Sequence, residues 1–127
     1  MNALNDKSSS AIVAVSDIDR ARHFYSDMLG LELNDEGMDG VLVYNTGATY
    51  LVVYPSEFAG TNKANAVAWD CGPDIDAIVA DLGARGVTFE HYEMDGVSYK
   101  DGIHDANGFR MAWFKDPDRN ILHLNSA

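Results

Sequence analysis

The sequence contains two similar stretches, each an amphipathic run that opens on Asp-Ile-Asp and closes at a glycine. The first runs from Ser16 to Leu33 and the second from Pro73 to Phe89. The two Asp-Ile-Asp motifs begin 57 positions apart and the closing glycines lie 56 positions apart, so the registers agree within one residue. A solenoid needs three or more repeats, and this one occurs only twice. We therefore expect two half-domains that close around one shared site.

Each half is predicted to fold in the order βαβββ. A short apolar run precedes each helix, Asp and Ser or Pro favour its start, and glycine favours its end. In the first half we expect a strand at 11–15, a helix over 16–29, a strand starting at 31–33, a polar turn at 34–40, and strands at 41–44 and 49–54. In the second half we expect a strand at 66–71, a helix over 73–86, and strands at 87–92, 109–114 and 121–124.

A long polar segment from Met94 to Gly108 interrupts the second half. It carries three glycines, and a stretch of that length in a compact domain is usually functional or disordered. Two interpretations stay open for it. It is a mobile rim that closes over a ligand with Tyr99 and His104, or it is an ordinary long hairpin with a disordered tip.

Composition limits the possible partners. A chain of 127 residues with 46% hydrophobic and 23% charged residues predicts one domain with a substantial core. Its formal net charge of −11 argues against nucleic acid and against anionic membrane surfaces, and favours a cationic small molecule. The single cysteine, Cys71, and the absence of a signal-peptide pattern in the first ten residues predict a cytoplasmic protein.

Two motifs, VSDIDRARHFYSDMLGLEL in the first half and WFKDPDRNIL in the second, resemble the vicinal oxygen chelate superfamily. That group holds glyoxalase I, bleomycin-resistance proteins, fosfomycin-resistance enzymes and extradiol dioxygenases. The resemblance implies an α+β fold in which two βαβββ modules form an open, cup-shaped, eight-stranded mixed sheet. It places module one at about 10–54, the linker at 55–64 and module two at about 65–126, within a single domain over 1–127. It also implies a homodimer, since relatives of this fold commonly form dimers.

Glyoxalase I-like relatives hold a metal with a His on the first strand and a Glu on the last strand of each module. Transferred by position, these four ligands fall on Ser10, Val52, Ala66 (or Val67) and His123. Valine and alanine offer no donor atom, and a lone serine hydroxyl is a poor ligand for a divalent ion. We therefore expect no metal and no cofactor.

Strand alternation places Tyr50, Val52 and Tyr54 on one face, the face that carries the ligand in metal-bearing relatives. His123 would face the cavity as a polar contact or general base, or be satisfied by neighbours at the sheet end. The aromatic positions either pack in the core or form the wall of an apolar pocket, and His104 either binds ligand or is solvated. The predicted ligand-binding residues are Tyr50, Val52, Tyr54, Trp69, His104, Met111, Trp113 and His123.

The sequence thus predicts metal-independent binding of a small organic molecule, cationic or aromatic, similar to bleomycin-resistance-type binding proteins. The alternative is an enzyme, either a glyoxalase-like lyase or isomerase or a dioxygenase-type enzyme. No catalytic residue can be named from the sequence. A regulatory domain that acts through protein contacts would need an exposed apolar patch.

Overall fold

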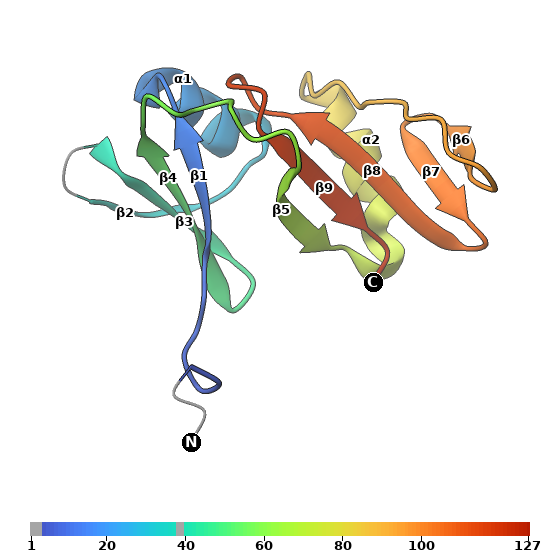
Figure 1. The fold of residues 1–127 in the computed structure, drawn as a ribbon, viewed down its shortest axis with the longest axis horizontal. Helices are drawn as coiled ribbons and strands as arrows, with labels where there is room; N and C mark the ends of the chain where they lie inside the picture. Colours follow the sequence, from blue (N-terminus) through green and yellow to red (C-terminus); the bar gives the residue numbers. More distant parts are fainter. Residues whose placement is uncertain (1–3, 38–39) are drawn as a thin grey trace.

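The computed structural model describes residues 4–37 and 40–127, and within them the chain forms an α+β fold with two mixed sheets (Figure 1). The first sheet has the order β1-β4-β3-β2, and β1 pairs in parallel with β4, the last strand of this half in the sequence. The remaining neighbours are antiparallel. Its strands are β1 (Ala11–Val15), β2 (Leu33–Glu36), β3 (Leu42–Thr46) and β4 (Thr49–Pro55).

The second sheet repeats this plan with one more strand. Its order is β5-β9-β8-β7-β6, and β5 pairs in parallel with β9, again the first and last strands of this half in the sequence. The strands β1 and β5 lie side by side where the two sheets meet (Figure 1). The second sheet contains β5 (Asn65–Asp70), β6 (Ser98–Lys100), β7 (Ile103–Ala106), β8 (Phe109–Lys115) and β9 (Ile121–Asn125).

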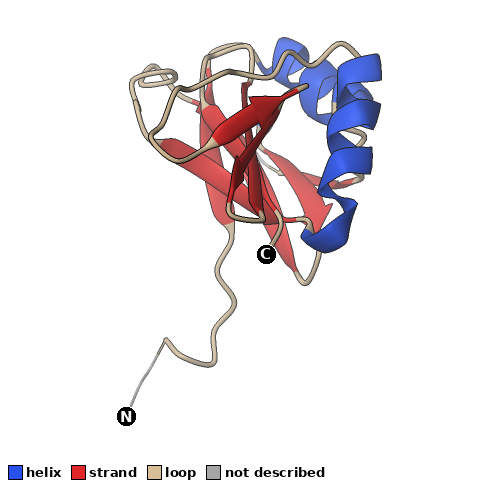
Figure 2. Cartoon of the chain, turned by 90° about the vertical axis from the view of Figure 1, so that its right-hand side faces the viewer, coloured by secondary structure: helices blue, strands red, loops and turns tan. Residues whose placement is uncertain are grey.

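The helices cover one side of both sheets and leave the other side open (Figure 2). The first begins as α1 (Ile18–Arg22) and continues as a π-helical turn over His23–Met28. Asp17 caps it, because its side chain accepts a hydrogen bond from the Arg20 backbone N–H at 3.0 Å. The second starts as a 3₁₀ turn (Gly72–Asp74) and continues as α2 (Ile75–Ala84).

The hydrophobic core lies between the helices and the sheets. Along β1, Val13 and Val15 are buried, and along β4, Leu51 and Val53 are buried, while the residues between them point to the open side. This alternation is the period of two that a sheet with one covered face requires. The open face is therefore built from the other half of each strand.

A turn between β8 and β9 links the second sheet to the first helix. The buried Tyr25 hydroxyl donates to Asp116 Oδ2 at 2.7 Å. Asn120 donates from its side-chain amide to Asp116 Oδ2 and to the Ala14 carbonyl, both at 2.8 Å. Asp116 Oδ1 accepts from the backbone N–H groups of Asp118 and Asn120. This junction holds the two sheets together through a chain of paired buried groups.

Three parts of the expected architecture differ. The strands form sheets of four and five rather than one sheet of eight. The polar turn expected at 34–40 holds part of β2 at its start, and its positions 38 and 39 lie outside the described residues. The strand expected at 87–92 is reduced to one bridge, between Phe89 and Phe114.

The segment from Met94 to Gly108 contains a hairpin, and its closure over a ligand stays a prediction. β6 and β7 pair in antiparallel register through a two-residue turn at Asp101 and Gly102. Both turn residues have positive φ, 51° and 88°, which is the geometry of a tight hairpin turn whose twist matches the strands. β7 then takes the place beside β8 that the expected strand at 87–92 leaves open.

Candidate functional site

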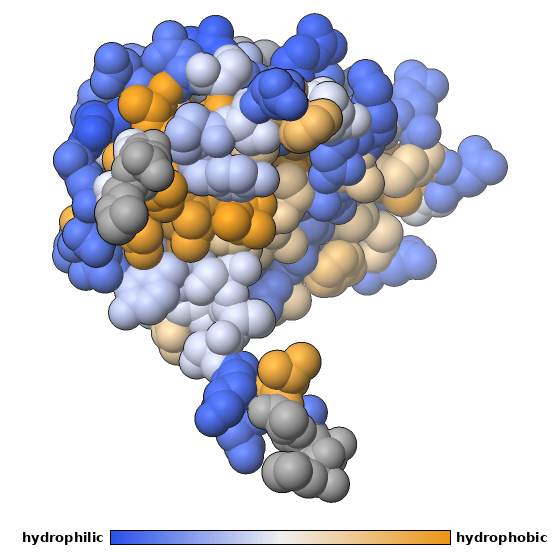
Figure 3. All heavy atoms as spheres, turned by 60° about the vertical axis from the view of Figure 1, so that its left-hand side comes forward, coloured by the Kyte–Doolittle hydropathy of each residue, from blue (hydrophilic) through white to orange (hydrophobic). Residues whose placement is uncertain are grey.

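Three predicted site residues lie on the open face of the first sheet. β4 turns Leu51 and Val53 into the core, so Tyr50, Val52 and Tyr54 point to the side that the helices do not cover. Tyr50 is 45% exposed and Val52 is partly buried. Val52 lies between Ile12 of β1 and Val43 of β3 in the strand register, and these make a cross-strand apolar row. Figure 3 shows apolar atoms gathered on this side of the molecule.

Four more predicted residues share the open face of the second sheet. His104 is paired with Met111 across β7 and β8, and Trp113 is paired with His123 across β8 and β9. Directly paired residues point to the same side of a sheet. Their neighbours Ala112 and Phe114 face the helices and are buried. The structure therefore brings these four side chains onto one surface.

Trp69 is the exception among the predicted site residues. In β5 it pairs in register with Leu124, which faces the helices, and its ring stacks on Phe114 with centroids 6.4 Å apart. It therefore lies on the opposite side of the sheet from His104 and His123. The sequence does not determine which side of the sheet Trp69 faces. β5 carries an irregularity between Asn65 and Val67 that shifts its pairing with β9 by one residue, and strand alternation alone does not reveal such a shift.

The open face of the second sheet carries a cluster of imidazole and aromatic rings, here called the imidazole–aromatic cluster. Trp113 lies at its centre, with ring centroids 4.7 Å from His123, 5.0 Å from His104 and 5.4 Å from Tyr92. At the edge near β6, the rings of His91 and Tyr99 stack with their centroids 3.8 Å apart. The members of the cluster are His91, Tyr92, Tyr99, His104, Trp113 and His123.

The sequence pairs Tyr99 with His104 in the segment 94–108, but it does not predict that His91 and Tyr92 lie in one site with them, Trp113 and His123. The backbone after Phe89 crosses to β6 and β7, and Tyr92 N–H donates to His104 Nε2 at 2.9 Å. This contact joins two segments that sequence alone treats as a strand end and a loop. The Asp-Gly pair at 101–102 was the available signal, because it is a strong marker of a hairpin that would bring Tyr99 opposite His104.

The two buried histidines have unused hydrogen-bonding capacity. His104 is fully buried and His123 is 8% exposed, and the Nδ1 atom of each forms no well-aligned hydrogen bond with the described residues. Burial lowers the pKa of both histidines, and contacts with the backbone, of Met111 for His104 and of Ala112 for His123, partly oppose this. Both imidazoles are thereby favoured in the neutral form, which can donate from one nitrogen and accept at the other.

The residues present do not fit the metal site of glyoxalase I-like relatives. Of the four transferred positions, Val52 and Ala66 have no donor atom, and Ser10 lies just before β1. His123 packs against Trp113 rather than beside another donor. Within 4–37 and 40–127, no group of three or more His, Cys, Asp or Glu side chains is placed to hold a metal ion.

The comparisons with known proteins identify the family. The profile described as "Glyoxalase/Bleomycin resistance protein/Dioxygenase superfamily" matches residues 7–124. The chain belongs to this superfamily. No curated protein matches the sequence. As the earlier motifs indicated, the membership lies in the vicinal oxygen chelate superfamily.

Three solved structures illustrate the range of this superfamily. The glyoxalase/bleomycin resistance protein from Catenulispora acidiphila is 25% identical, with a TM-score of 0.69 over 93% of this chain and 96% of that one. The lactoylglutathione lyase from Agrobacterium tumefaciens is 16% identical, with a TM-score of 0.67 over 94% and 92%. The fosfomycin resistance protein FosX from Mesorhizobium loti is 13% identical, with a TM-score of 0.67 over 96% and 92%. The fold of this superfamily thus supports enzymes and resistance proteins alike.

Cys71 is partly buried, and burial raises the pKa of its thiol against a backbone hydrogen bond with Asn125, with smaller contributions from Asp70 and Asp74. It is therefore a weak nucleophile. Among the described residues, no helix has the length and apolar character that crossing a membrane requires.

Proposed function

We propose that this protein binds a small planar organic molecule against the imidazole–aromatic cluster, without a resident metal or cofactor. The observation that carries this proposal is Trp113, a partly exposed indole lying between two buried imidazoles at 4.7 and 5.0 Å. Buried polar atoms in native structures are normally hydrogen-bonded, so two Nδ1 atoms without a well-aligned partner in one cluster favour a functional role. A ligand that stacks on Trp113 and bonds to a reoriented imidazole would supply the missing partner.

The charge of the chain favours a cationic member of this class. A net charge of −11 gives the surface a negative potential that raises the local concentration of cations. Tyr50 and Tyr54 lie on the open face of the first sheet, so both sheets carry aromatic side chains on the side that the helices do not cover. The proposal therefore places this protein functionally with the bleomycin-resistance-type binding members of its superfamily.

A thermal-shift panel of planar aromatic compounds tests this proposal, run with and without divalent ions. A cognate ligand at a hundred times its dissociation constant should raise the free energy of unfolding by about 2.7 kcal/mol. The gain should disappear in His123→Gln and persist in His23→Gln, a variant of an exposed helix residue. A gain that requires a divalent ion, or about one metal per chain in elemental analysis of protein purified without chelators, would overturn the metal-independent assignment.

A second candidate is a metal-independent lyase or isomerase acting on the same face. The lowered pKa of His123 supports it, since a neutral imidazole can accept a proton at neutral pH. In this function the neutral His123 takes a proton from a C–H or O–H bond of the substrate and returns it to another atom of the substrate or to its leaving group. Turnover of a bound ligand, followed by NMR and abolished in His123→Gln, would support the enzyme. Stable binding of the same ligand without chemical change would support the binding protein.

A homodimer remains a prediction for this chain. The apolar row of Ile12, Val43 and Val52 on the open face of the first sheet is the surface on which we expect the contact, and Ile12 is 60% exposed. Light scattering on the purified protein should give twice the mass of the chain. Ile12→Lys should shift the distribution toward the monomer, and an unchanged mass in that variant would place the contact elsewhere.

A further inference from the structure

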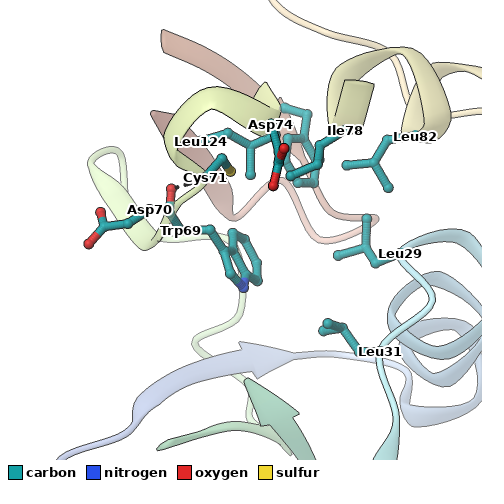
Figure 4. Close-up of a pocket in the computed structure, with 10 residues that line it drawn as sticks. Leu29, Leu31, Trp69, Asp70, Cys71, Asp74, Ile78, Leu82 and Leu124 are labelled. Carbon is teal, nitrogen blue, oxygen red and sulfur yellow. Dashed lines mark hydrogen bonds between the residues drawn. The ribbon is translucent and has the colours of Figure 1, made fainter. Parts of the chain in front are cut away.

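A separate cavity lies on the helix-covered side, between the end of the first helix and the start of the second. Its volume is about 320 Å³, within the range of small-molecule sites. It is on the other side of the sheets from the imidazole–aromatic cluster, and nothing in the proposed function uses it. Figure 4 shows its walls, which come from the chain after the first helix, from β5 and from α2.

The walls of this cavity are mostly apolar. Leu29 and Leu31 form one wall, and Ile78 and Leu82 on α2 form the other. The indole ring of Trp69, from β5, borders the same space on a third side (Figure 4). A flat indole among leucine and isoleucine side chains suits a ring-shaped or branched hydrocarbon body, because apolar contact area and ring stacking both favour it.

One charged group points into this apolar space. Asp74 is the last residue of the 3₁₀ turn that leads into α2, and its side chain is exposed. It accepts no capping hydrogen bond and forms no ion pair with the described residues. Figure 4 shows its carboxylate directed toward the cavity, while the carboxylate of the neighbouring Asp70 points away.

We propose that this cavity binds an amphiphilic amine, with a ring in the apolar space and its ammonium group against Asp74. The strongly negative net charge of the chain favours a cation over an anion of the same shape. The face of Trp69 offers a second attraction for a cation near the ring. The leucine and isoleucine walls of the cavity contribute only hydrocarbon side chains, so the rest of the ligand must be apolar.

Three compounds with the same indole ring test the proposal by charge alone. Tryptamine carries an ammonium group, tryptophol a hydroxyl, and indole-3-propionate a carboxylate on the same two-carbon spacer. Isothermal titration calorimetry at low salt should show tryptamine binding about fivefold more tightly than tryptophol, as expected for a partly exposed ion pair, and no binding of indole-3-propionate. Equal affinities for the amine and the acid, or no detectable tryptamine binding at millimolar concentration, would overturn the proposal.

Two neighbouring carboxylates provide a matched pair of variants. Asp74→Asn should reduce tryptamine affinity to that of tryptophol, and it breaks no hydrogen bond at the helix start because the Asp74 side chain makes none there. Asp70→Asn removes the same charge four positions earlier, from a residue that also lines the cavity but whose carboxylate points away from it, and should leave the affinity within a factor of two. A similar loss in both variants would reduce the effect to general surface charge and overturn the assignment to Asp74.

The two tryptophans report which face is occupied, independently of any variant. In ¹⁵N-labelled protein, tryptamine should move the indole N–H resonance of Trp69 and leave that of Trp113 in place. Movement of the Trp113 resonance alone would put the amine on the open face of the second sheet, which would overturn this site while supporting the proposed function. The two proposals can therefore fail separately.

Discussion

Two buried polar clusters in this molecule differ in how completely they are paired. At the turn between β8 and β9, Asp116 accepts hydrogen bonds from Tyr25, from Asn120 and from two backbone N–H groups. In the imidazole–aromatic cluster, the Nδ1 atoms of both buried histidines lack a well-aligned partner. A fully paired network rigidifies a fold, whereas a partly paired one costs stability and persists where it has a use.

How completely the buried polar atoms are hydrogen-bonded distinguishes a structural cluster from a functional one better than their burial does. Asp116 and His123 are similarly buried, at 4% and 8% exposure, and both carry titratable groups. The partners of Asp116 come from the first helix and from its own turn, so its bonds join the two sheets. The surroundings of His123 are rings that leave a bonding site unused. Substitutions in the two clusters should therefore have opposite consequences.

The largest expected effect is on the paired cluster. Asp116→Ala leaves the buried Tyr25 hydroxyl and the Asn120 side chain without their shared acceptor, and each unpaired group retains its desolvation cost. We expect the free energy of unfolding in urea to fall by about 3 to 4 kcal/mol. Asp95→Ala, in an exposed loop position, should change it by less than about 0.5 kcal/mol. A loss below about 1 kcal/mol in Asp116→Ala would show that water replaces the missing carboxylate.

The next effect comes from the linker that packs on the same turn. Gly60 has a φ of +78°, and a Cβ there would lie 2.5 Å from the Asp118 carbonyl oxygen. Gly60→Ala should therefore lower the free energy of unfolding by about 2 kcal/mol or more, through backbone strain and displacement of the turn.

Gly96→Ala is the matched control, because Gly96 has a φ of +74° and a Cβ added there would meet no atom within 4 Å. Gly96→Ala should lower the free energy of unfolding only by the cost of holding alanine in a left-handed backbone conformation, about 1 kcal/mol. Equal losses at Gly60 and Gly96, measured by urea unfolding, would show that the turn moves aside freely and that the linker does not fix it.

A smaller effect of opposite sign is expected in the unpaired cluster. His123→Leu replaces a buried imidazole with an apolar side chain, and this removes an unsatisfied polar atom. The free energy of unfolding should stay unchanged or rise by up to about 1 kcal/mol, while binding of a planar aromatic ligand is lost. His23→Leu, on the exposed helix surface, should change neither. A loss of more than about 2 kcal/mol in His123→Leu would place His123 among the structural groups.

Sequence patterns predicted the parts of the fold that depend on local periodicity. The strand at 11–15 matches β1, and the alternation along β4 placed Tyr50, Val52 and Tyr54 on the side away from the helices. The repeat predicted two units of the same plan, and the pairing of β1 with β4 is reproduced by that of β5 with β9. Strand alternation and helix ends carry this information because they are set by neighbouring residues.

The sequence left questions open where a single residue changes the register and where a loop and a hairpin share one composition. The irregularity in β5 is such a case for Trp69, which lies on the helix-covered face, since a shift of one residue reverses every side chain. At 94–108 the glycine and polar content allowed both a mobile rim and an ordinary hairpin, and Asp101-Gly102 and Asn107-Gly108 are both tight-turn pairs with positive φ. The imidazole–aromatic cluster depends on those two turns, so its full membership could not be predicted from strand periodicity.

The last prediction concerns the pH dependence of stability. The pKa values of His104 and His123 are lowered in the folded protein by burial, so the unfolded chain binds protons at these positions first. Their contribution to stability is therefore present above the unfolded pKa of about 6.5 and is lost as the pH falls through it. Below that value the free energy of unfolding should decrease by at most about 1.4 kcal/mol per pH unit for each histidine.

Asp116 acts in the opposite direction. Burial raises its pKa, against the hydrogen bonds from Asn120 and Tyr25, so its folded form holds a proton more readily than the unfolded chain. Its contribution to stability therefore increases as the pH falls, whereas that of the two histidines decreases. Urea unfolding between about pH 8 and pH 5.5, compared between the natural sequence and His123→Leu, isolates the contribution of His123 because Asp116 is present in both. His123→Leu should flatten the decrease and His23→Leu should retain it, whereas an unchanged slope in His123→Leu would mean that His123 titrates alike in the folded and unfolded chain.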